Sequence, residues 1–110
     1  MERFVNGEIV VVLSPFSDLP EAKKRPAFVL ADLMGDDIIL CQITSKISDD
    51  FYSIPLDQTD FENGSLNRES NIRPNRIFTA DKKIITKKIG QLKPEKYVVV
   101  TETIIKIIRL

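Results

Sequence analysis

Short apolar runs rich in β-branched residues alternate along the chain with polar stretches that carry glycine or proline. Such runs predict β-strands, because Val, Ile and Thr fit a pleated, half-buried surface. The predicted strands cover residues 8–13, 26–33, 38–44, 51–56, 70–73, 76–79 and 84–86. Residues 34–37 form a turn signal between two of these runs, which predicts a hairpin. Residues 14–24 and 57–67 are polar and are predicted as loops.

Towards the C-terminal end of the chain, the spacing of the apolar residues changes from that of a strand to that of a helix. Tyr97, Val100 and Ile104 lie at helical spacing, and Pro94 suits the first position of a helix. The β-branched residues of 98–101 also fit a strand, but the spacing favours a helix. Pro55 marks the strand at 51–56 as an edge strand. The pattern therefore predicts one domain over residues 1–110, mainly β with a C-terminal helix, in a small, strongly curved sheet or barrel.

Composition narrows the chemistry that this domain can use. The 110 residues include one cysteine and no histidine. The missing histidine removes the usual general base and the commonest metal ligand, and a lone cysteine excludes both a disulfide framework and a cysteine zinc site. Cys41 lies inside an apolar run, where packing in the core is its simplest role. We expect neither a metal nor a cofactor.

Targeting signals are not evident. No apolar run approaches the roughly 18 residues of a membrane span, and the first residues lack the shape of a signal peptide. We therefore expect a cytoplasmic protein with no membrane partner.

Charge is unevenly distributed although the net charge is zero. Residues 26–70 carry nine acids and only two bases, Lys46 and Arg68, whereas residues 71–110 carry ten bases and three acids. This asymmetry predicts an electropositive face built largely by residues 71–110, with Lys23, Lys24 and Arg25 as further contributors. Two interpretations stay open: contact with nucleic acid, RNA more than DNA, or a lysine-rich surface that is merely solvated.

Arg25 stands just ahead of the strand predicted over 26–33, and Thr44-Ser45 closes the strand predicted over 38–44. Neighbouring strands can bring this guanidinium and a hydroxyl together. Arginine donates in a fork that matches phosphate oxygens and can stabilise the charge that develops on them, and a hydroxyl adds a further hydrogen bond. From spacing alone, a surface arginine and a threonine that caps its own turn remain the simpler interpretation.

An ordered series of motifs resembles the MazF/PemK (Kid) family of toxin endoribonucleases from type II toxin–antitoxin pairs. The series is Gly7-Glu8-Ile9-Val10, then Lys24-Arg25-Pro26-Ala27-Phe28-Val29-Leu30, then Ile43-Thr44-Ser45, and finally the stretch 70–92 that ends in Ile89-Gly90-Gln91-Leu92. The resemblance implies an SH3-like, strongly bent antiparallel barrel with a C-terminal helix, assembled as a homodimer. It implies sequence-specific, metal-independent cleavage of single-stranded RNA that leaves a 2′,3′-cyclic phosphate and a 5′-hydroxyl. It also implies a small acidic antitoxin as partner.

The resemblance also assigns residues. Arg25 matches the catalytic arginine and Thr44 the hydroxyl that holds the phosphate, with the adjacent Ser45 as a weaker candidate. Lys24 belongs to the loop that flanks the RNA groove. Glu21 stands one place nearer to Arg25 than the family's glutamate does, and it is the nearest acid that could serve as a base.

The stretch 70–76 departs from the family pattern. Some members place an acid and an arginine here, but this chain has Arg73 at the place of the acid and Asn71 at the place of the arginine. Arg73 and Arg76 are then candidates for gripping phosphates.

Two other functions compete with a ribonuclease toxin. The altered stretch favours a non-catalytic SH3-like module that binds RNA or an acidic peptide through its basic face. A gyrase-poisoning toxin of the related CcdB type is the third hypothesis, and the pair of Arg25 and Thr44 argues against it because gyrase poisoning needs no phosphate-cleaving site.

Overall fold

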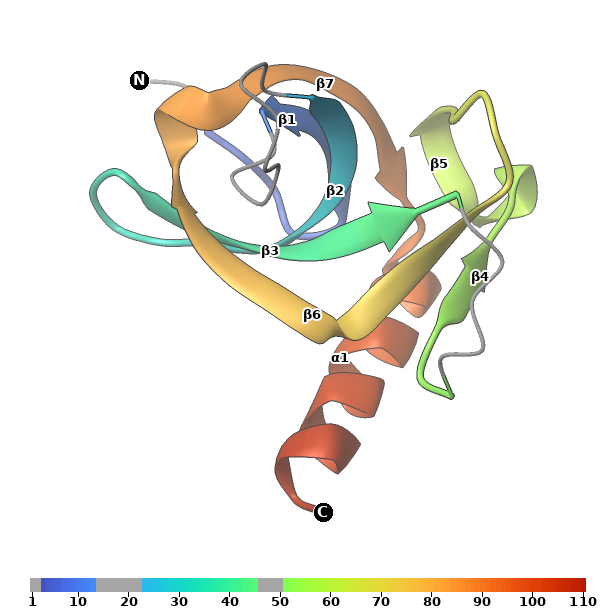
Figure 1. Ribbon diagram of the computed structural model, residues 1–110. Helices are drawn as coiled ribbons and strands as arrows, with labels where there is room; N and C mark the ends of the chain where they lie inside the picture. The colour runs from blue at the N-terminus through green and yellow to red at the C-terminus, as the bar shows by residue number, and fades with distance from the viewer. Residues whose placement is uncertain (1–2, 14–22, 46–50) are drawn as a thin grey trace.

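The computed structural model describes residues 3–13, 23–45 and 51–110. Seven antiparallel strands form one sheet in the order β4-β6-β3-β2-β1-β7-β5, and this sheet curls into a half-barrel beside one C-terminal helix (Figure 1). The strands are β1 (Glu8–Leu13), β2 (Lys24–Asp32), β3 (Asp37–Thr44), β4 (Ile54–Leu56), β5 (Phe61–Gly64), β6 (Ser70–Asp81) and β7 (Ile85–Leu92). The helix is α1 (Pro94–Ile108), and the two 3₁₀ turns are η1 (Gln58–Asp60) and η2 (Lys82–Ile84). The prediction of a mainly β fold with a C-terminal helix is confirmed.

Strand β6 is bent at the proline that appeared to divide it. The pieces predicted at 70–73 and 76–79 are one continuous strand of 12 residues. Its register against β3 jumps from Cys41↔Ile77 to Gln42↔Arg73, so the residues at 74–76 have no partner on β3. Proline has no N–H to donate to a ladder, and a bulge at that point turns the strand without ending it (Figure 1). One strand therefore serves two walls of the molecule.

Both faces of the central strands are buried. Ile9 and Phe28 belong to a core cluster that includes Val100 and Ile104 of α1, so this cluster lies between the sheet and the helix. Their neighbours in sequence belong to a second cluster, made of Phe4, Val10, Val12, Ala27, Val29, Ile38 and Leu40. Because side chains alternate along a strand, continuous apolar runs are what a strand buried on both sides requires.

Helix α1 begins at Pro94 as predicted, and its apolar stripe packs on the sheet. Tyr97 stacks on Phe28 with ring centroids 5.8 Å apart and donates a hydrogen bond of 2.8 Å to the carbonyl of Leu30. Val100 and Ile104 are buried. The contact ends there, because the last turn of the helix is largely exposed. In the described ranges, no helix is long and apolar enough to cross a membrane.

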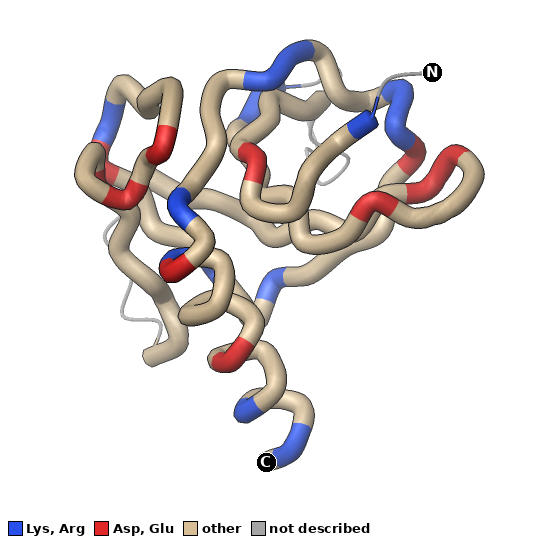
Figure 2. Tube along the Cα trace, turned by 180° about the vertical axis from the view of Figure 1, so that it is seen from behind, with Lys and Arg blue, Asp and Glu red and all other residues tan. Residues whose placement is uncertain are grey.

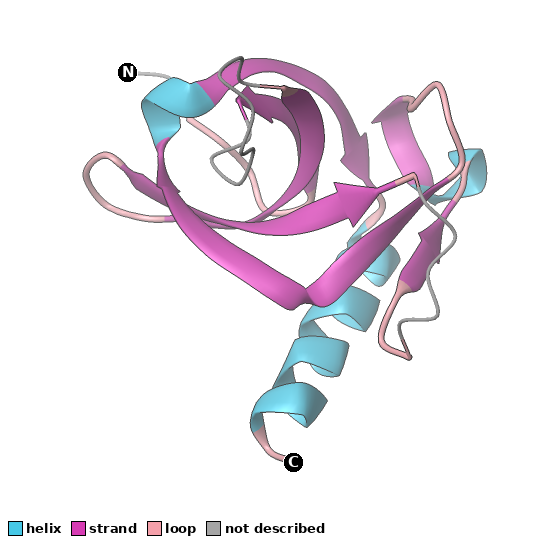
Figure 3. Ribbon diagram, viewed as in Figure 1, coloured by secondary structure: helices cyan, strands magenta, loops and turns pink. Residues whose placement is uncertain are grey.

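The loop predicted over residues 57–67 is wrong in part, because it holds η1 and β5 (Figure 3). Asp57 and Asp60 cap η1 reciprocally, and β5 pairs with β7 at the end of the sheet opposite β4. The strand predicted at 84–86 is η2 followed by the longer strand β7. The strand predicted at 51–56 is confined to β4, which is an edge strand as Pro55 indicated.

Candidate functional site

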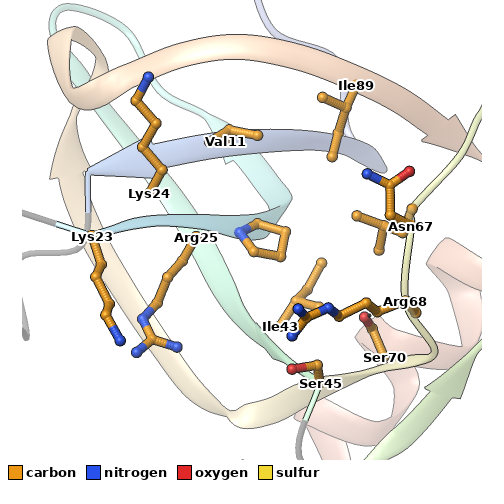
Figure 4. A pocket seen from close by; sticks show the side chains of 12 residues that line it. Val11, Lys23, Lys24, Arg25, Ile43, Ser45, Asn67, Arg68, Ser70 and Ile89 are labelled. Carbon is orange, nitrogen blue, oxygen red and sulfur yellow. Dashed lines mark hydrogen bonds between the residues drawn. The ribbon is translucent and has the colours of Figure 1, made fainter.

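A pocket of about 350 Å³ opens between β2, the end of β3 and the segment that joins β5 to β6 (Figure 4). We call it the basic pocket. Its lining consists of Val11, Lys23, Lys24, Arg25, Pro26, Ile43, Ser45, Leu66, Asn67, Arg68, Ser70 and Ile89. The register Val11↔Pro26 between β1 and β2 sets two of the apolar lining residues side by side. Strands β1, β2, β3 and β7 therefore each contribute an apolar residue to the floor of the basic pocket.

The polar residues that are described in the lining of the basic pocket are cationic or neutral. Lys23, Lys24, Arg25 and Arg68 line it, and none of the described lining residues is a carboxylate. All four cations are exposed, and none of their charged groups is held by an ion pair within the part of the chain that the structure describes. Unpaired cations around a concave surface attract anions and raise their local concentration.

Arg25 enters the basic pocket from strand β2, where it lies opposite Val12 of β1. Figure 4 shows its side chain pointing the same way as that of Lys23, whereas Lys24 points in the opposite direction, as alternation along a strand requires. The following Pro26 is half-buried and forms part of the floor. The paired strand thus fixes the backbone of Arg25 while its guanidinium stays free to bind.

Arg68 reaches the same pocket from the segment between β5 and β6. The hydroxyl of Ser70 donates a hydrogen bond of 3.0 Å to the carbonyl of Arg68, which fixes the backbone from which this arginine projects. Ser70 itself is buried, whereas Arg68 is exposed. In Figure 4 the side chains of Arg68, Ser45 and Ser70 gather around the end of β3.

The two predicted hydroxyl residues, Thr44 and Ser45, differ in their relation to the basic pocket. Ser45 lines the basic pocket, and Thr44 is not among the lining residues. Thr44 is half-buried at the last position of β3, where it pairs with Asn71 of β6. Arg25 and Thr44 lie at the same end of their two strands, beyond the last described pair of β2 and β3, Ala27↔Gln42.

Arg73 lies opposite Gln42, which in turn lies opposite Ala27. Residues directly opposite one another in antiparallel strands share a face, so these three side chains form one row across β2, β3 and β6. Thr44 lies two residues beyond Gln42 on β3 and Arg25 two residues before Ala27 on β2, which is the same face by alternation.

Two further predicted residues lie elsewhere. Arg76 is exposed at the bend of β6, outside the basic pocket. Glu21 lies outside the described residues.

The cations described in the basic pocket come from positions 23–25 and 68. Lys23, Lys24 and Arg25 were expected contributors to a positive surface, and the electropositive face expected from residues 71–110 stays a prediction. The sequence analysis also missed Asn67, Arg68 and Ser70 as site residues. The signal was Arg68 itself, one of only two bases among nine acids in residues 26–70. Its place in the lining of the basic pocket gives this base, which stands in an acidic segment, a role.

Metal-ligating side chains do not cluster in the described ranges, where no group of three or more His, Cys, Asp or Glu could hold an ion. Cys41 is buried in the core, and burial raises the pKa of its thiol to about 12. The groups that the basic pocket offers are guanidinium, ammonium, hydroxyl and amide. These groups donate hydrogen bonds to an anion and stabilise negative charge that develops on oxygen.

Comparison with known families decides the identity. The model of the PemK-like, MazF-like toxins of type II toxin–antitoxin systems matches residues 6–108. The chain belongs to this family. The match runs from before β1 to the end of α1 and includes every residue of the basic pocket. Among curated proteins, no sequence matches significantly.

Solved structures of MazF proteins share the fold. The Mycobacterium tuberculosis toxin MazF-mt6 superposes with a TM-score of 0.73 at 18% identity, covering 94% of this chain and 97% of that one. A mycobacterial endoribonuclease in complex with its cognate antitoxin gives 0.76 at 10% identity, covering 98% and 97%. The MazE–MazF complex of Deinococcus radiodurans gives 0.71 at 14% identity, covering 93% and 91%. The half-barrel with a C-terminal helix is therefore a MazF-like fold.

Proposed function

We propose that this MazF-like chain is an endoribonuclease toxin that cleaves single-stranded RNA at specific sequences without a metal ion. The observation that carries the proposal is the basic pocket, where the described lining brings Lys23, Lys24, Arg25, Arg68 and two serine hydroxyls around an apolar floor. RNA fits this chemistry, because the oxygens of its phosphodiester are negative and the faces of its bases can stack on apolar surface. Family membership and the endoribonuclease activity named for similar mycobacterial structures support the same conclusion.

The proposed reaction uses the ribose next to the scissile phosphate. The 2′-oxygen loses its proton and attacks phosphorus, the bond from phosphorus to the 5′-oxygen breaks, and the departing 5′-oxygen takes a proton from water. The products are a 2′,3′-cyclic phosphate and a 5′-hydroxyl. Arg25 binds the non-bridging oxygens and stabilises the additional charge that they carry in the transition state. Thr44 or Ser45 donates a further hydrogen bond to the phosphate. Glu21 is the candidate acceptor of the proton from the 2′-hydroxyl.

The test is cleavage of a long single-stranded RNA in excess EDTA, with the ends of the fragments mapped. Wild type is expected to produce defined fragments with 5′-hydroxyl ends. Arg25→Ala is expected to lower the rate by roughly 10²–10³-fold, the usual cost of losing one donor to a developing oxyanion. Its fold should persist because Arg25 is exposed, which thermal unfolding checks.

Lys83→Ala is the matched control for Arg25→Ala. Lys83 is an exposed cation whose ammonium lies 3.9 Å from Asp81, outside the basic pocket. The control should cut RNA at the wild-type rate. Equal rates for wild type and Arg25→Ala would overturn the role of Arg25, and intact RNA with folded wild type would overturn the ribonuclease.

A module that binds RNA without cutting it is the second candidate. Among the residues that the structure describes, none that lines the basic pocket is a carboxylate, and this favours the module because general-base catalysis needs an acceptor for the proton. The same experiment separates the two candidates: RNA that shifts in a binding assay but stays intact in EDTA, and with added Mg²⁺, supports the binding module.

We also propose an antitoxin as partner, since the family functions in toxin–antitoxin pairs and the Deinococcus radiodurans MazF forms a complex with MazE. An acidic tail would compete with RNA for the exposed cations of the basic pocket. Bound only to the folded toxin, it would raise the free energy of unfolding by mass action.

A further inference from the structure

A second concave surface borders the basic pocket. It measures about 330 Å³ and is lined by Leu56, Asp57, Gln58, Phe61, Leu66, Asn67, Arg68 and Glu69. We call it the β4–β5 pocket, after the two strands that flank it. Leu66, Asn67 and Arg68 line both pockets, so the two lie on either side of this short segment. An extended polymer that crosses the segment enters both.

The chemistry of the β4–β5 pocket differs from that of its neighbour. Leu56, Phe61 and Leu66 supply an apolar wall, and Asp57 and Glu69 bring two carboxylates against one cation. Negative charge repels a phosphate, whereas an apolar wall with polar edges suits a nucleobase. The cationic lining on one side of residues 66–68 therefore suits the phosphate of a nucleotide. The apolar and carboxylate lining on the other side suits its base.

Two polar side chains of the β4–β5 pocket, Asp57 and Gln58, are already engaged in hydrogen bonds. Asp57 accepts hydrogen bonds of 2.7 Å and 2.6 Å from the backbone and the hydroxyl of Thr59, which hold the pKa of its carboxyl below the ordinary value. The amide of Gln58 donates 3.1 Å to the carbonyl of Gly64. Glu69 is exposed, and no ion pair or hydrogen bond occupies its carboxylate within the described ranges.

We propose that the β4–β5 pocket is a base-specificity site for guanine, with Glu69 as the residue that selects it. This inference rests on the proposed ribonuclease function and names the substrate feature that sets its sequence preference. An ionised carboxylate is an acceptor only. Guanine presents two adjacent donors, N1–H and the N2 amino group, which one carboxylate accepts together. Uracil presents a single N–H between two carbonyl oxygens, and these oxygens repel a carboxylate.

Arg68 connects the two sites. Its carbonyl is fixed by Ser70 and its side chain lies on the wall that both pockets share. A phosphate bound by Arg68 in the basic pocket holds its own nucleotide against residues 66–68. The base of that nucleotide then has the β4–β5 pocket within reach.

The experiment is digestion of a pool of RNAs with a randomised segment, followed by sequencing of the cleaved ends. Wild type is expected to enrich guanine over uracil by about tenfold at one position near the cut, which corresponds to one good polar contact. Glu69→Gln replaces one acceptor oxygen by an amino donor and is expected to abolish this enrichment. Replacing guanine by inosine, which lacks the N2 amino group, should lower the rate for wild type and not for Glu69→Gln.

Glu62→Gln is the matched control, because Glu62 is an exposed glutamate of the adjacent strand β5 and lines neither pocket. It should keep the wild-type profile. Wild type that cuts RNA without a guanine preference, or with one that Glu69→Gln retains, overturns this inference and leaves the ribonuclease intact. Wild type that cuts no RNA overturns both. Equal unfolding midpoints for wild type and Glu69→Gln exclude a loss of fold as the cause of a changed profile.

Discussion

The role of Arg68 can be inferred from the residues that lie near it in the fold, and not from its neighbours in the sequence. Along the sequence it stands in the acidic stretch of residues 26–70. In the fold it joins Arg25, which is more than forty positions away, on the lining of one pocket. Two guanidinium groups suit a phosphate, because each donates in a planar fork that matches its oxygens. The pair is therefore more informative than either arginine alone.

Cys41 is the residue whose environment predicts its reactivity most directly. Burial raises the pKa of its thiol from 9.0 to about 12, so at pH 8 the thiolate is about a thousandfold rarer than in the unfolded chain. Alkylation by iodoacetamide should therefore be much slower in native protein than in urea. Equally fast labelling in both states would contradict the buried position.

The same shift links stability to pH. The folded pKa of Cys41 lies above the unfolded value, so folding favours the neutral thiol. Its contribution to the free energy of unfolding is fully present below about pH 9 and is lost as the pH rises towards 12.

At the scale of elements, Gly64 holds the end strand β5 against β7. Its φ is +76°, and a Cβ there would lie 2.2 Å from the carbonyl oxygen of Ile89 and 2.4 Å from the Cα of Gly90. Both contacts are with backbone, which cannot move aside. Gly64→Ala is therefore expected to lower the free energy of unfolding by about 3 kcal/mol or more, from strain and overpacking together.

Gly35 provides the control for this substitution. Its φ is +82°, yet nothing lies within 4 Å of a Cβ built there. Gly35→Ala should cost only about 1 kcal/mol of backbone strain. Urea unfolding of both variants measures the difference, and equal costs would show that the approach of β5 to β7 is not tight.

Elements also differ in how well the sequence predicts them. β1, β2, β3 and α1 follow from their apolar patterns because they are buried on one or both sides. β5 was missed because only Phe61 among its four residues is buried, and its other residues resemble a loop. The length of β7 was missed for the same reason, since Lys87 and Lys88 interrupt its apolar pattern. End strands draw their stability from pairing, which a single sequence does not display.

The site shows the same limit. Arg25, Lys24 and Ser45 were predicted and line the basic pocket. The sequence analysis did not predict Asn67, Arg68 and Ser70, because their proximity to Arg25 depends on the bend of β6 and on the segment that precedes this strand. Polar residues that are close in space but far apart in the sequence form no repeating pattern from which their proximity could be predicted.

At the scale of the whole molecule, charge is sorted by position. Figure 2 shows acidic residues at the hairpin between β2 and β3 and around β5, whereas basic residues follow β7 and the end of α1. The net charge is zero, so attraction to a polyanion must come from local patches and not from the molecule as a whole. The basic pocket is one such patch, because its described lining holds Lys23, Lys24, Arg25 and Arg68.

This arrangement predicts the salt dependence of RNA binding. Each cation that neutralises a phosphate of a single strand contributes about −0.7 to the slope of log K against log salt concentration, so four contribute about −3. Fluorescence anisotropy with a 2′-O-methyl RNA, which cannot form the cyclic phosphate, measures this slope. Arg68→Ala should make it shallower by about 0.7, and Lys83→Ala should leave it unchanged. A slope near zero for wild type would contradict binding through these cations.

The lining of the basic pocket begins at Val11 and ends at Ile89, and β1 is closed only when β7 pairs with it. A growing chain lacks this last wall until β7 (Ile85–Leu92) has been made. Folding during translation proceeds from the N-terminus, so the first strands of the half-barrel emerge without a complete basic pocket. The proposed RNA site is therefore complete only after β7 has left the ribosome.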